Sequence, residues 1–486
     1  MLSPTSLPAC AKARRWLLLA LPLLSAALAV TPLRSLADSP QSTPSRTFTV
    51  QEAIGYALAN YPAVQAAVER YLAARGGVGL ARTSYVPALT MLYQEDRATR
   101  NAIASLLMPQ SVIANPSGTT LTPSSQTFWG SGAGVLLSYD VLDFGYRRSQ
   151  LHAAESTEKR SEEEVELTRL EVTAAVADAS LVVLAAHQQV QASQADVARR
   201  TVFAQAVHAL VDARLRPGAD ASRVDAELAE ARNGLILAEE LERLTSAAFA
   251  RLLGLAGTRL AVSPGPFLGA PNEGTWRAPP AASHPAAVAG MDRVEESRAA
   301  ISVIDHSYLP HVSVQALASR RGSGANAQGR LIGEDAGLEP NVASNWGAGV
   351  SVTFQPLAIA SVHEQKSIET AHEREQQALY DQTVQNIETQ AEQARARLEA
   401  ARRIAANTPE ELRASKDSEV QAVARFKAGL GTIVDVAEAQ RLLLRAQIDD
   451  SLATLNVWRA LAGLAAAQGN FEPFIDLVNR SGGGGR

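Results

Sequence analysis

The sequence predicts a mainly α fold with a small β part, built from a helix–strand–strand–long helix–helix unit that occurs twice. Three observations lead to this fold class. Segments of the first half of the chain reappear in the same order in the second half. Two long runs, 146–216 and 358–428, contain almost no glycine or proline, as very long helices require. Four short segments alternate apolar residues with small or polar ones, which is typical of strands.

The composition is that of a globular protein. The 486 residues are 46% hydrophobic but only 5% aromatic, so the core is expected to consist of closely packed, alanine-rich and leucine-rich helices. The formal net charge of -5 provides no basic surface for nucleic acid.

The N-terminus carries a targeting signal. Basic residues at positions 12, 14 and 15 precede the apolar run WLLLALPLLSAALAV. This pattern predicts a secretory signal peptide, residues 1–37, with cleavage after Ala37 or after Ala29. The only cysteine, Cys10, precedes the apolar run, which is the wrong place for a lipid-attachment cysteine. No later run of about 18 apolar residues predicts a transmembrane helix.

The internal repeat sets the expected organisation. Three segment pairs match: YVPALTM with YLPHVSV, GAGVLLSYDVL with GAGVSVTFQPL, and ARLRPGADASRVDAE with ARFKAGLGTIVDVAE. The third match places Gly218 over Gly429, 211 positions later, and we expect both glycines to reverse the chain because glycine costs about 1 kcal/mol inside a helix. The predicted organisation is a signal peptide at 1–37, repeat 1 at 38–261 (strands at about 86–97 and 129–141, helical hairpin at 146–256), a linker at 262–285, repeat 2 at 286–470 (strands at about 310–319 and 346–355, helical hairpin at 358–468) and a flexible tail at 471–486.

The two long runs predict helices on the order of 100 Å long. Their small apolar residues recur at spacings of three and four, which favours coiled-coil-like packing; an ordinary solvated coiled coil is the alternative. In the second run, Pro409 follows Thr408, which can act as an N-cap. We therefore predict a kink or break near Asn407.

The four predicted strands have the length that crosses a bilayer when tilted, although a half-buried sheet would show the same alternation. Long polar loops, 98–127 and 320–345, join consecutive strands, as outer-membrane barrels do. Four strands cannot close a membrane barrel, so membrane-spanning strands would have to share one barrel with other copies of the chain. Aromatic residues at the strand ends are candidates for interfacial girdles: Trp129, Tyr139, Trp346 and Phe354.

The order of elements, the Tyr-x-Pro entry to each strand pair and the segment AGLGTIVDVAEAQ resemble the TolC family of outer-membrane efflux ducts over residues 48–470. The resemblance implies a homotrimer with a shared 12-strand barrel in the lipid of the outer membrane and a long α-helical tunnel in the periplasm. The linker would lie in an equatorial belt. It also implies the function of exit duct in a tripartite efflux or type I secretion system. The partners would be a periplasmic adaptor protein and an inner-membrane pump, and no cofactor is expected.

The same resemblance implies a gate at the two helix turns. Asp435 and Glu438 match acidic residues that line the aperture, and three copies would form two acidic rings that favour cations. Phe426 and Gly431 stand where family members have a tyrosine and an arginine of the closed gate. The residues expected to contact the adaptor are Arg214, Gly218, Arg425, Gly429, Leu430 and Thr432.

Two other classes of protein are weighed against this interpretation. An exported coiled-coil interaction or adaptor protein explains the helices but not the strands with long loops. An exported enzyme has little support, because Pro310 prevents a helical metal pair of His306 and His311. We expect no catalytic site and no metal site. The acidic run 162–166 is expected to be a solvated helix face.

Overall fold

The computed structural model describes residues 46–99, 126–271, 279–324, 332–333, 335–340 and 343–482. The predicted signal peptide and the greater part of both long loops lie outside these ranges. So do residues 272–278 of the predicted linker and the last four residues.

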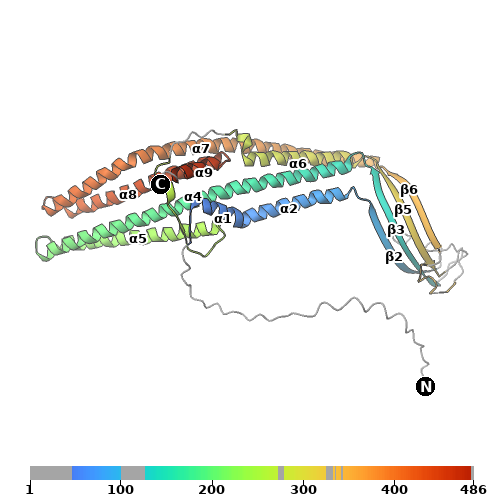
Figure 1. The fold of residues 1–486 in the computed structure, drawn as a ribbon, viewed down its shortest axis with the longest axis horizontal. Coiled ribbons are helices and arrows are strands. Elements are labelled where there is room, and N and C mark those ends of the chain that lie inside the picture. Colours follow the sequence, from blue (N-terminus) through green and yellow to red (C-terminus); the bar gives the residue numbers. More distant parts are fainter. Residues whose placement is uncertain are drawn as a thin grey trace, which may run out of the picture. The chain divides into compact units, whose positions relative to one another are not determined.

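The predicted mainly α fold with a small β part is present, and both repeats contain the order helix, strand, strand, long helix, helix (Figure 1). The first repeat contains α1 (Val50–Asn60), α2 (Pro62–Thr83), β2 (Ala88–Thr99), β3 (Thr127–Leu142), α4 (Tyr146–Asp212) and α5 (Gly218–Leu252). The second contains α6 (Pro285–Ser307), β5 (His311–Ser323), β6 (Ala343–Thr353), the 3-10 turn η3 (Pro356–Ala358), α7 (Ile359–Lys427) and α8 (Ile433–Ala467). The first repeat has an additional helix, α1, before the common unit, and the second has the 3-10 turn, η3, before its long helix.

Helix α4 lies at the centre of the helical part. Its half nearer the strands packs against α2 and α6, and its other half packs against α5 and α8; α7 packs against α6 and α8 (Figure 1). Residues buried along α4 include the small side chains of Ala177, Ser180 and Ala186. Small residues at these positions let the neighbouring helices approach closely, as the alanine-rich composition predicts.

The largest aromatic side chain in the core is Trp458 of α8, which is fully buried. Its ring packs edge-on against Phe267 and Phe474, with centroid distances of 5.0 and 6.2 Å. Its indole N–H donates to the carbonyl of Gly269 at 2.9 Å, so the one polar atom of this ring is satisfied. The contacts fix a part of the predicted linker, including η1 (Gly265–Leu268), onto the helical hairpin.

The C-terminal segment corrects a prediction. Residues 472–482 form a helix, α9 (Glu472–Gly482), where we predicted a flexible tail at 471–486. Phe471, Phe474, Leu477 and Val478 are buried in the core around Trp458. The spacing of three and four residues gives this short segment one apolar face, which the core covers.

A small sheet was not predicted. Strand β1 (Arg46–Phe48) pairs in parallel with β4 (Leu260–Val262), which lies at the boundary of the predicted repeat 1 and linker. Each strand has only three residues, which is too short for a periodic pattern to be read from the sequence.

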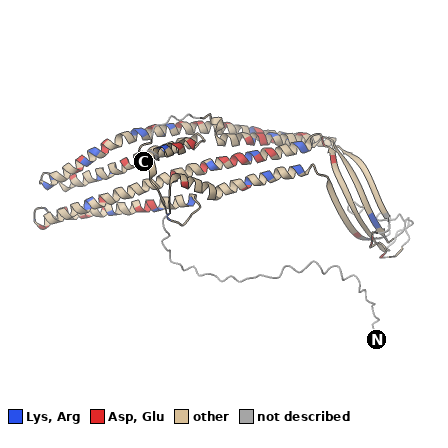
Figure 2. Ribbon diagram, viewed as in Figure 1, with Lys and Arg blue, Asp and Glu red and all other residues tan. Residues whose placement is uncertain are grey.

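The four longer strands form one antiparallel sheet in the order β2-β3-β5-β6. The register places most of the apolar residues of the four strands on one face: Leu89, Met91, Val135, Leu137, Tyr139, Val314, Ala316, Ala318, Trp346, Ala348 and Val350. Leu92, Leu136 and Leu317 are exceptions on the other face. The other face is mostly small or polar: Gly132, Gly134, Ser138, Gln315, Ser319, Asn345, Gly347 and Gly349. Figure 2 shows that charged residues are numerous on the helices and sparse on this sheet.

Both outer strands of this sheet have a free edge. In the part of the chain that the structure describes, β2 pairs only with β3, and β6 pairs only with β5. Each edge therefore presents a row of unpaired backbone N–H and C=O groups. Such edges are not tolerated in the hydrocarbon core of a membrane unless another strand pairs with them.

We predicted a kink or break near Asn407, and the structure shows that the helix does not break there. Helix α7 continues from Ile359 to Lys427 with Pro409 inside it, and Thr408 caps no helix. Instead, the Thr408 hydroxyl is buried and donates to Asp450 Oδ1 on α8 at 3.0 Å. Packing against α8 compensates for the backbone hydrogen bond that the proline removes.

One described helix, α4, contains a stretch long and apolar enough to cross a membrane by length and composition alone. We had expected no such candidate. Half of that stretch is buried inside the chain, as in the core helix of any large protein, because α4 packs on several sides.

Candidate functional site

The two helical hairpins, α4–α5 and α7–α8, reverse direction in tips with the same backbone. In tip 1 (residues 213–217), the N–H groups of Arg214 and Leu215 bond to carbonyls of the last turn of α4, at 2.9 Å each. In tip 2 (residues 428–432), Gly429 and Leu430 make the equivalent bonds at 3.0 and 2.9 Å. Both tips are helix C-caps with one left-handed residue, Arg214 with φ 59° and Gly429 with φ 77°.

This geometry corrects the predicted alignment. Arg214 matches Gly429, 215 positions later, and Gly218 is the first residue of α5, not the residue that reverses the chain. The predicted spacing of 211 differs by four residues, about one helical turn. A shift of one turn keeps apolar residues on the same helix face, so the two sequences still match over the helices.

The start of α8 is closed by a capping box. Thr432 Oγ1 accepts from the Asp435 N–H at 3.3 Å, while Asp435 Oδ2 accepts from the Thr432 N–H at 2.9 Å. The Thr432 hydroxyl also donates to Asp435 Oδ2, at 2.9 Å. The hydrogen bonds that the Thr432 N–H and hydroxyl donate lower the pKa of Asp435, and the charge of Arg425 adds to the effect. Helix α5 begins after Pro217 and has no side-chain cap. Asp435 therefore stabilises the helix start, whatever role it has at an aperture.

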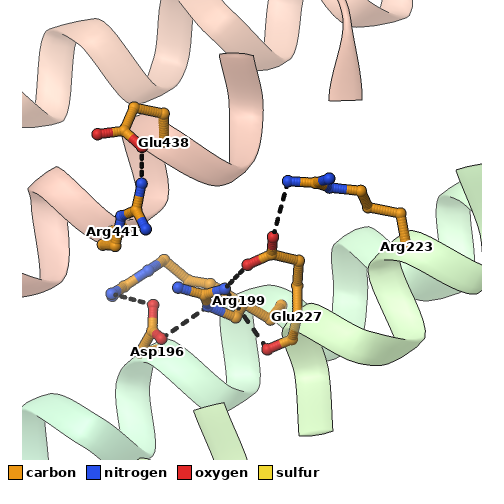
Figure 3. A network of polar contacts seen from close by, with 7 residues as sticks. Asp196, Arg199, Arg223, Glu227, Glu438 and Arg441 are labelled. Carbon is orange, nitrogen blue, oxygen red and sulfur yellow. Dashed lines mark hydrogen bonds and ion pairs between the residues drawn. The ribbon is translucent and has the colours of Figure 1, made fainter. Parts of the chain in front are cut away.

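Glu438 lies one turn beyond Asp435, and both side chains are exposed. Glu438 forms an ion pair with Arg441, three residues further along α8 (Figure 3). A basic partner thus accompanies each copy of this acid, which lowers the negative charge that the predicted ring would carry.

Phe426, which the resemblance placed in the gate, is buried between the two hairpins of the chain. Its side chain is 1% exposed and packs edge-on against Phe203 of α4, with 5.5 Å between ring centroids. The guanidinium of Arg216 lies 4.3 Å from the Phe426 ring centroid and donates to the Phe426 carbonyl at 2.6 Å. Phe426 is thus the centre of a core that joins the two tips.

Arg216 was not among the predicted site residues. It comes from tip 1 but makes both of its contacts with Phe426 at the end of α7. In the structural register Arg216 matches Gly431, the position at which the family resemblance implied an arginine. The predicted spacing of 211 concealed this correspondence.

The ends of both tips are exposed. Leu215 and Leu430, at matching positions, are 69% and 74% exposed, and Arg214 and Arg425 are also exposed. Two bulky apolar side chains with no cover on the chain itself are a candidate contact for another protein.

A charged network with a buried centre, Asp196 and Arg200, lies further from the tips (Figure 3). Asp196 of α4 is 1% exposed and accepts from Arg200 Nε at 2.8 Å. Arg200 also donates to Glu227 of α5 at 2.9 Å, and Arg223 lies 3.5 Å from the same carboxylate. Removing one partner from such a network is costly, because the other charge stays buried without compensation.

Arg199 extends this network to the second hairpin. It donates to Asp196 at 3.2 Å and to the side-chain oxygen of Gln447 on α8 at 3.0 Å. Our prediction missed the network; the signal was present as an Asp-x-x-Arg-Arg segment on one helix face, at spacings of three and four.

The acidic run 162–166 is not simply a solvated face. Glu164 accepts from Arg160 and from Arg293 of α6, each at 2.9 Å. These ion pairs lower the pKa of Glu164, although burial acts to raise it. Burial raises the pKa of Glu163. The run therefore helps to join α4 to α6, a partner that the sequence of α4 alone does not reveal.

Among the described residues, no group of three or more His, Cys, Asp or Glu side chains is placed to hold a metal ion. His306 Nδ1 bonds to the carbonyl of Ser302 at 2.6 Å. The ring of His311 packs against Tyr146.

Comparison with known families gives one match, which covers most of the chain. Residues 53–255 and 282–470 match the family described as outer membrane efflux protein. No curated protein matches the chain.

Several solved structures share the fold. The outer-membrane channel CmeC of Campylobacter jejuni is 15% identical, with a TM-score of 0.73 over 92% of this chain and 94% of that one. VceC of Vibrio cholerae is 18% identical, with a TM-score of 0.69 over 87% and 97%. The open-state channel MtrE of Neisseria gonorrhoeae is 18% identical, with a TM-score of 0.66 over 87% and 89%.

Proposed function

Because this chain belongs to the outer membrane efflux protein family, we propose that three copies of it assemble into one exit duct of a tripartite efflux or type I secretion system. The family and its structural neighbours are outer-membrane channels rather than enzymes. The observation that carries the proposal of a trimer is the sheet, which has one continuous apolar face and two unpaired edges.

Pairing β6 of one copy with β2 of the next would satisfy the unpaired backbone groups at both edges. Three copies would close a 12-strand barrel, with the apolar face toward lipid and the face of small and polar residues toward the lumen. Trp129 and Trp346 lie toward the loop end of the apolar face, and Tyr139 lies toward its helix end, as interfacial aromatic girdles require.

The helical part supports the same arrangement. Large apolar side chains are exposed on α2 and α5: Leu72, Leu80, Ile236, Leu237, Leu241 and Leu244. Others are exposed on α7, the helix at the opposite side of α4: Ile368, Leu379, Ile404 and Val420. A head-to-tail ring would bury the first set of one copy against the second set of its neighbour.

The tips would form the periplasmic end of the duct. We assign to the contact with a periplasmic adaptor the exposed tip residues Arg214, Gly218, Arg425, Gly429, Leu430 and Thr432, together with Leu215. An inner-membrane pump would supply the substrate. The contact between Arg216 and Phe426 holds the two tips together and takes the role that the missing tyrosine and arginine have in relatives.

Asp435 and Glu438 would face the aperture three times each, with Arg441 as the opposing charge. We expect Glu438→Gln to lower the cation preference of single channels and Arg441→Gln to raise it. If both variants had the same cation selectivity as the parent channel, the assignment of these residues to the aperture would be wrong.

The assembly is tested on outer-membrane extracts. The protein is expected to migrate as a trimer on gels without heating and as a monomer after heating. It should also restore drug resistance to a strain that lacks its own outer-membrane duct but keeps the pump and adaptor. A stable monomer in the periplasmic fraction would contradict the proposal.

A further inference from the structure

A basic side chain lies on the apolar face of the sheet, where that face becomes polar. Along β5, Val312, Val314, Ala316 and Ala318 share the apolar face, and Arg320 is the next residue on it. From Val312 to Arg320 the strand covers about 26 Å, at about 3.3 Å per residue. This matches the height of about 25 Å that the apolar band of an outer-membrane barrel has.

The surroundings of Arg320 suit a membrane interface. Arg320 pairs with Ala133 on β3 and with Ser344 on β6. Trp346 pairs with Ala318, which is the next residue pair of this face in the direction of the helices. Trp346 is 85% exposed, the highest fraction among the large apolar residues of this face. Tryptophan is enriched at the headgroup level of membranes, and arginine next to it can extend toward the polar side.

Arg320 is exposed, and within the described part of the chain its side chain has no hydrogen bond or ion pair. Two acidic residues stand one residue pair further toward the loops on this face. Glu95 is two strands away, and the Glu339 carbonyl lies against Gly322 on the strand of Arg320 itself. In the described part of the chain, neither acid forms an ion pair with Arg320. The other arginine of this face, Arg97, already contacts Thr127 at 3.0 Å and the ring of Trp129. Among the residues that the structure describes, the guanidinium of Arg320 therefore has no polar partner.

We propose that Arg320 and Trp346 form a binding site on the outside of the channel for the phosphate of an anionic lipid headgroup. The site occurs once in each copy and lies at the loop end of the sheet, in the leaflet that faces out of the cell. The planar guanidinium offers paired N–H donors to phosphate oxygens, and the indole ring packs beside the acyl chains. The site rests on the proposed membrane-spanning role of the sheet, and the experiment separates the two.

The chain offers a matched control at the next position. Arg321 pairs with Gly132 and therefore points to the opposite face of the sheet, the one assigned to the lumen. Arg320→Gln and Arg321→Gln remove the same charge from the same strand, but only the first removes it from the lipid side.

The experiment measures lipid preference by quenching of tryptophan fluorescence. Purified trimers are placed in phosphatidylcholine vesicles that contain brominated phosphatidylglycerol or brominated phosphatidylcholine. Trp346→Phe gives the background from the other tryptophans. One arginine at a membrane surface contributes about five-fold in affinity for anionic lipid. We expect the parent and Arg321→Gln to prefer phosphatidylglycerol over phosphatidylcholine by about this factor. Arg320→Gln is expected to lose this preference.

Each result decides a different point. An unchanged preference in Arg320→Gln, or an equal loss in Arg321→Gln, would overturn the lipid site. If neither brominated lipid quenches Trp346, the apolar face does not meet lipid, and the spanning role of the sheet fails with it. Added inorganic phosphate should leave the preference unchanged, whereas its loss would identify a free-anion site instead. Only variants that migrate as trimers are compared, so a folding defect is excluded.

Discussion

The two hairpin tips have the same backbone but different residues, and the difference assigns them different tasks. Tip 1 carries Arg214 at its left-handed position and reaches across with Arg216. Tip 2 has Gly429 at the same position, and its return helix starts with the capping box of Thr432. Tip 1 therefore supplies the contact between the hairpins, and tip 2 is the better stabilised turn.

This difference shows that duplication preserved the path of the chain while the side chains diverged. The cap hydrogen bonds depend only on backbone groups, so almost any sequence that ends a helix can retain them. The contact between the tips needs one long donor side chain, and it is sufficient for one tip to carry it.

The largest expected effect comes from removing the centre of the joined core. Phe426→Ala should lower the free energy of local opening at both tips by about 3–5 kcal/mol, because it leaves a cavity beside Phe203. Hydrogen exchange of amides in both tips measures this opening. Phe426→Leu, the control, keeps most of the volume and should cost less. Faster exchange in tip 2 alone would contradict a shared core.

Arg216→Ala is expected to have the next largest effect. It removes a hydrogen bond and a cation–π contact, for a total of about 2–3 kcal/mol of local opening free energy. Drugs should enter the cell through the duct more readily, because its periplasmic end is less tightly held. Hydrogen exchange of the amides at both tips should accelerate. The control is Arg214→Ala, which removes an exposed arginine of the same loop. If both variants behave alike, the contact does not hold the tips together.

Thr432→Ala should affect tip 2 alone. Loss of the N-cap costs about 1 kcal/mol at the start of α8, while α5, which has no side-chain cap, is unchanged.

The stability of this N-cap should also depend on pH. The pKa of Asp435 is lowered in the folded chain, so its stabilising effect is present above the unfolded value of about 4 and is lost as pH falls through the lowered pKa. Hydrogen exchange of the tip 2 amides, corrected for the intrinsic rate, should rise over this pH range in the parent protein but not in Asp435→Asn.

The smallest expected effect tests the left-handed positions. Arg214→Gly should raise the free energy of opening of tip 1 by about 0.5–1 kcal/mol, because glycine adopts positive φ without strain. Gly429→Ala should destabilise tip 2 by a similar amount. Opposite signs are the expected result, and the same sign in both variants would show that the two positions are not equivalent.

The sequence by itself determined the fold class, the duplication and the approximate segments of the four strands. These features depend on local patterns that repeat over many residues, namely the alternation in strands and the long absence of glycine and proline in helices. The residues of tip 2 were indicated by the resemblance to the family, whereas the capping box of Thr432 and Asp435 was found in the structure, although it lies within one helical turn. The register of the repeat could not be fixed to better than one turn, since the helix faces match at either spacing.

Only the tertiary structure decided which residues meet. Phe426 was assigned to the gate because it stands where relatives have a tyrosine, but Phe203 and Arg216 cover it from the other hairpin. Pro409 looked like a break, yet packing of α7 on α8 retains the helix. Contacts between residues about 200 positions apart depend on how whole helices pack, and no local pattern encodes them. The same holds for the extent of β5, because pairing with β3 and β6 continues through Arg320 and Arg321, beyond the predicted strand end at about residue 319.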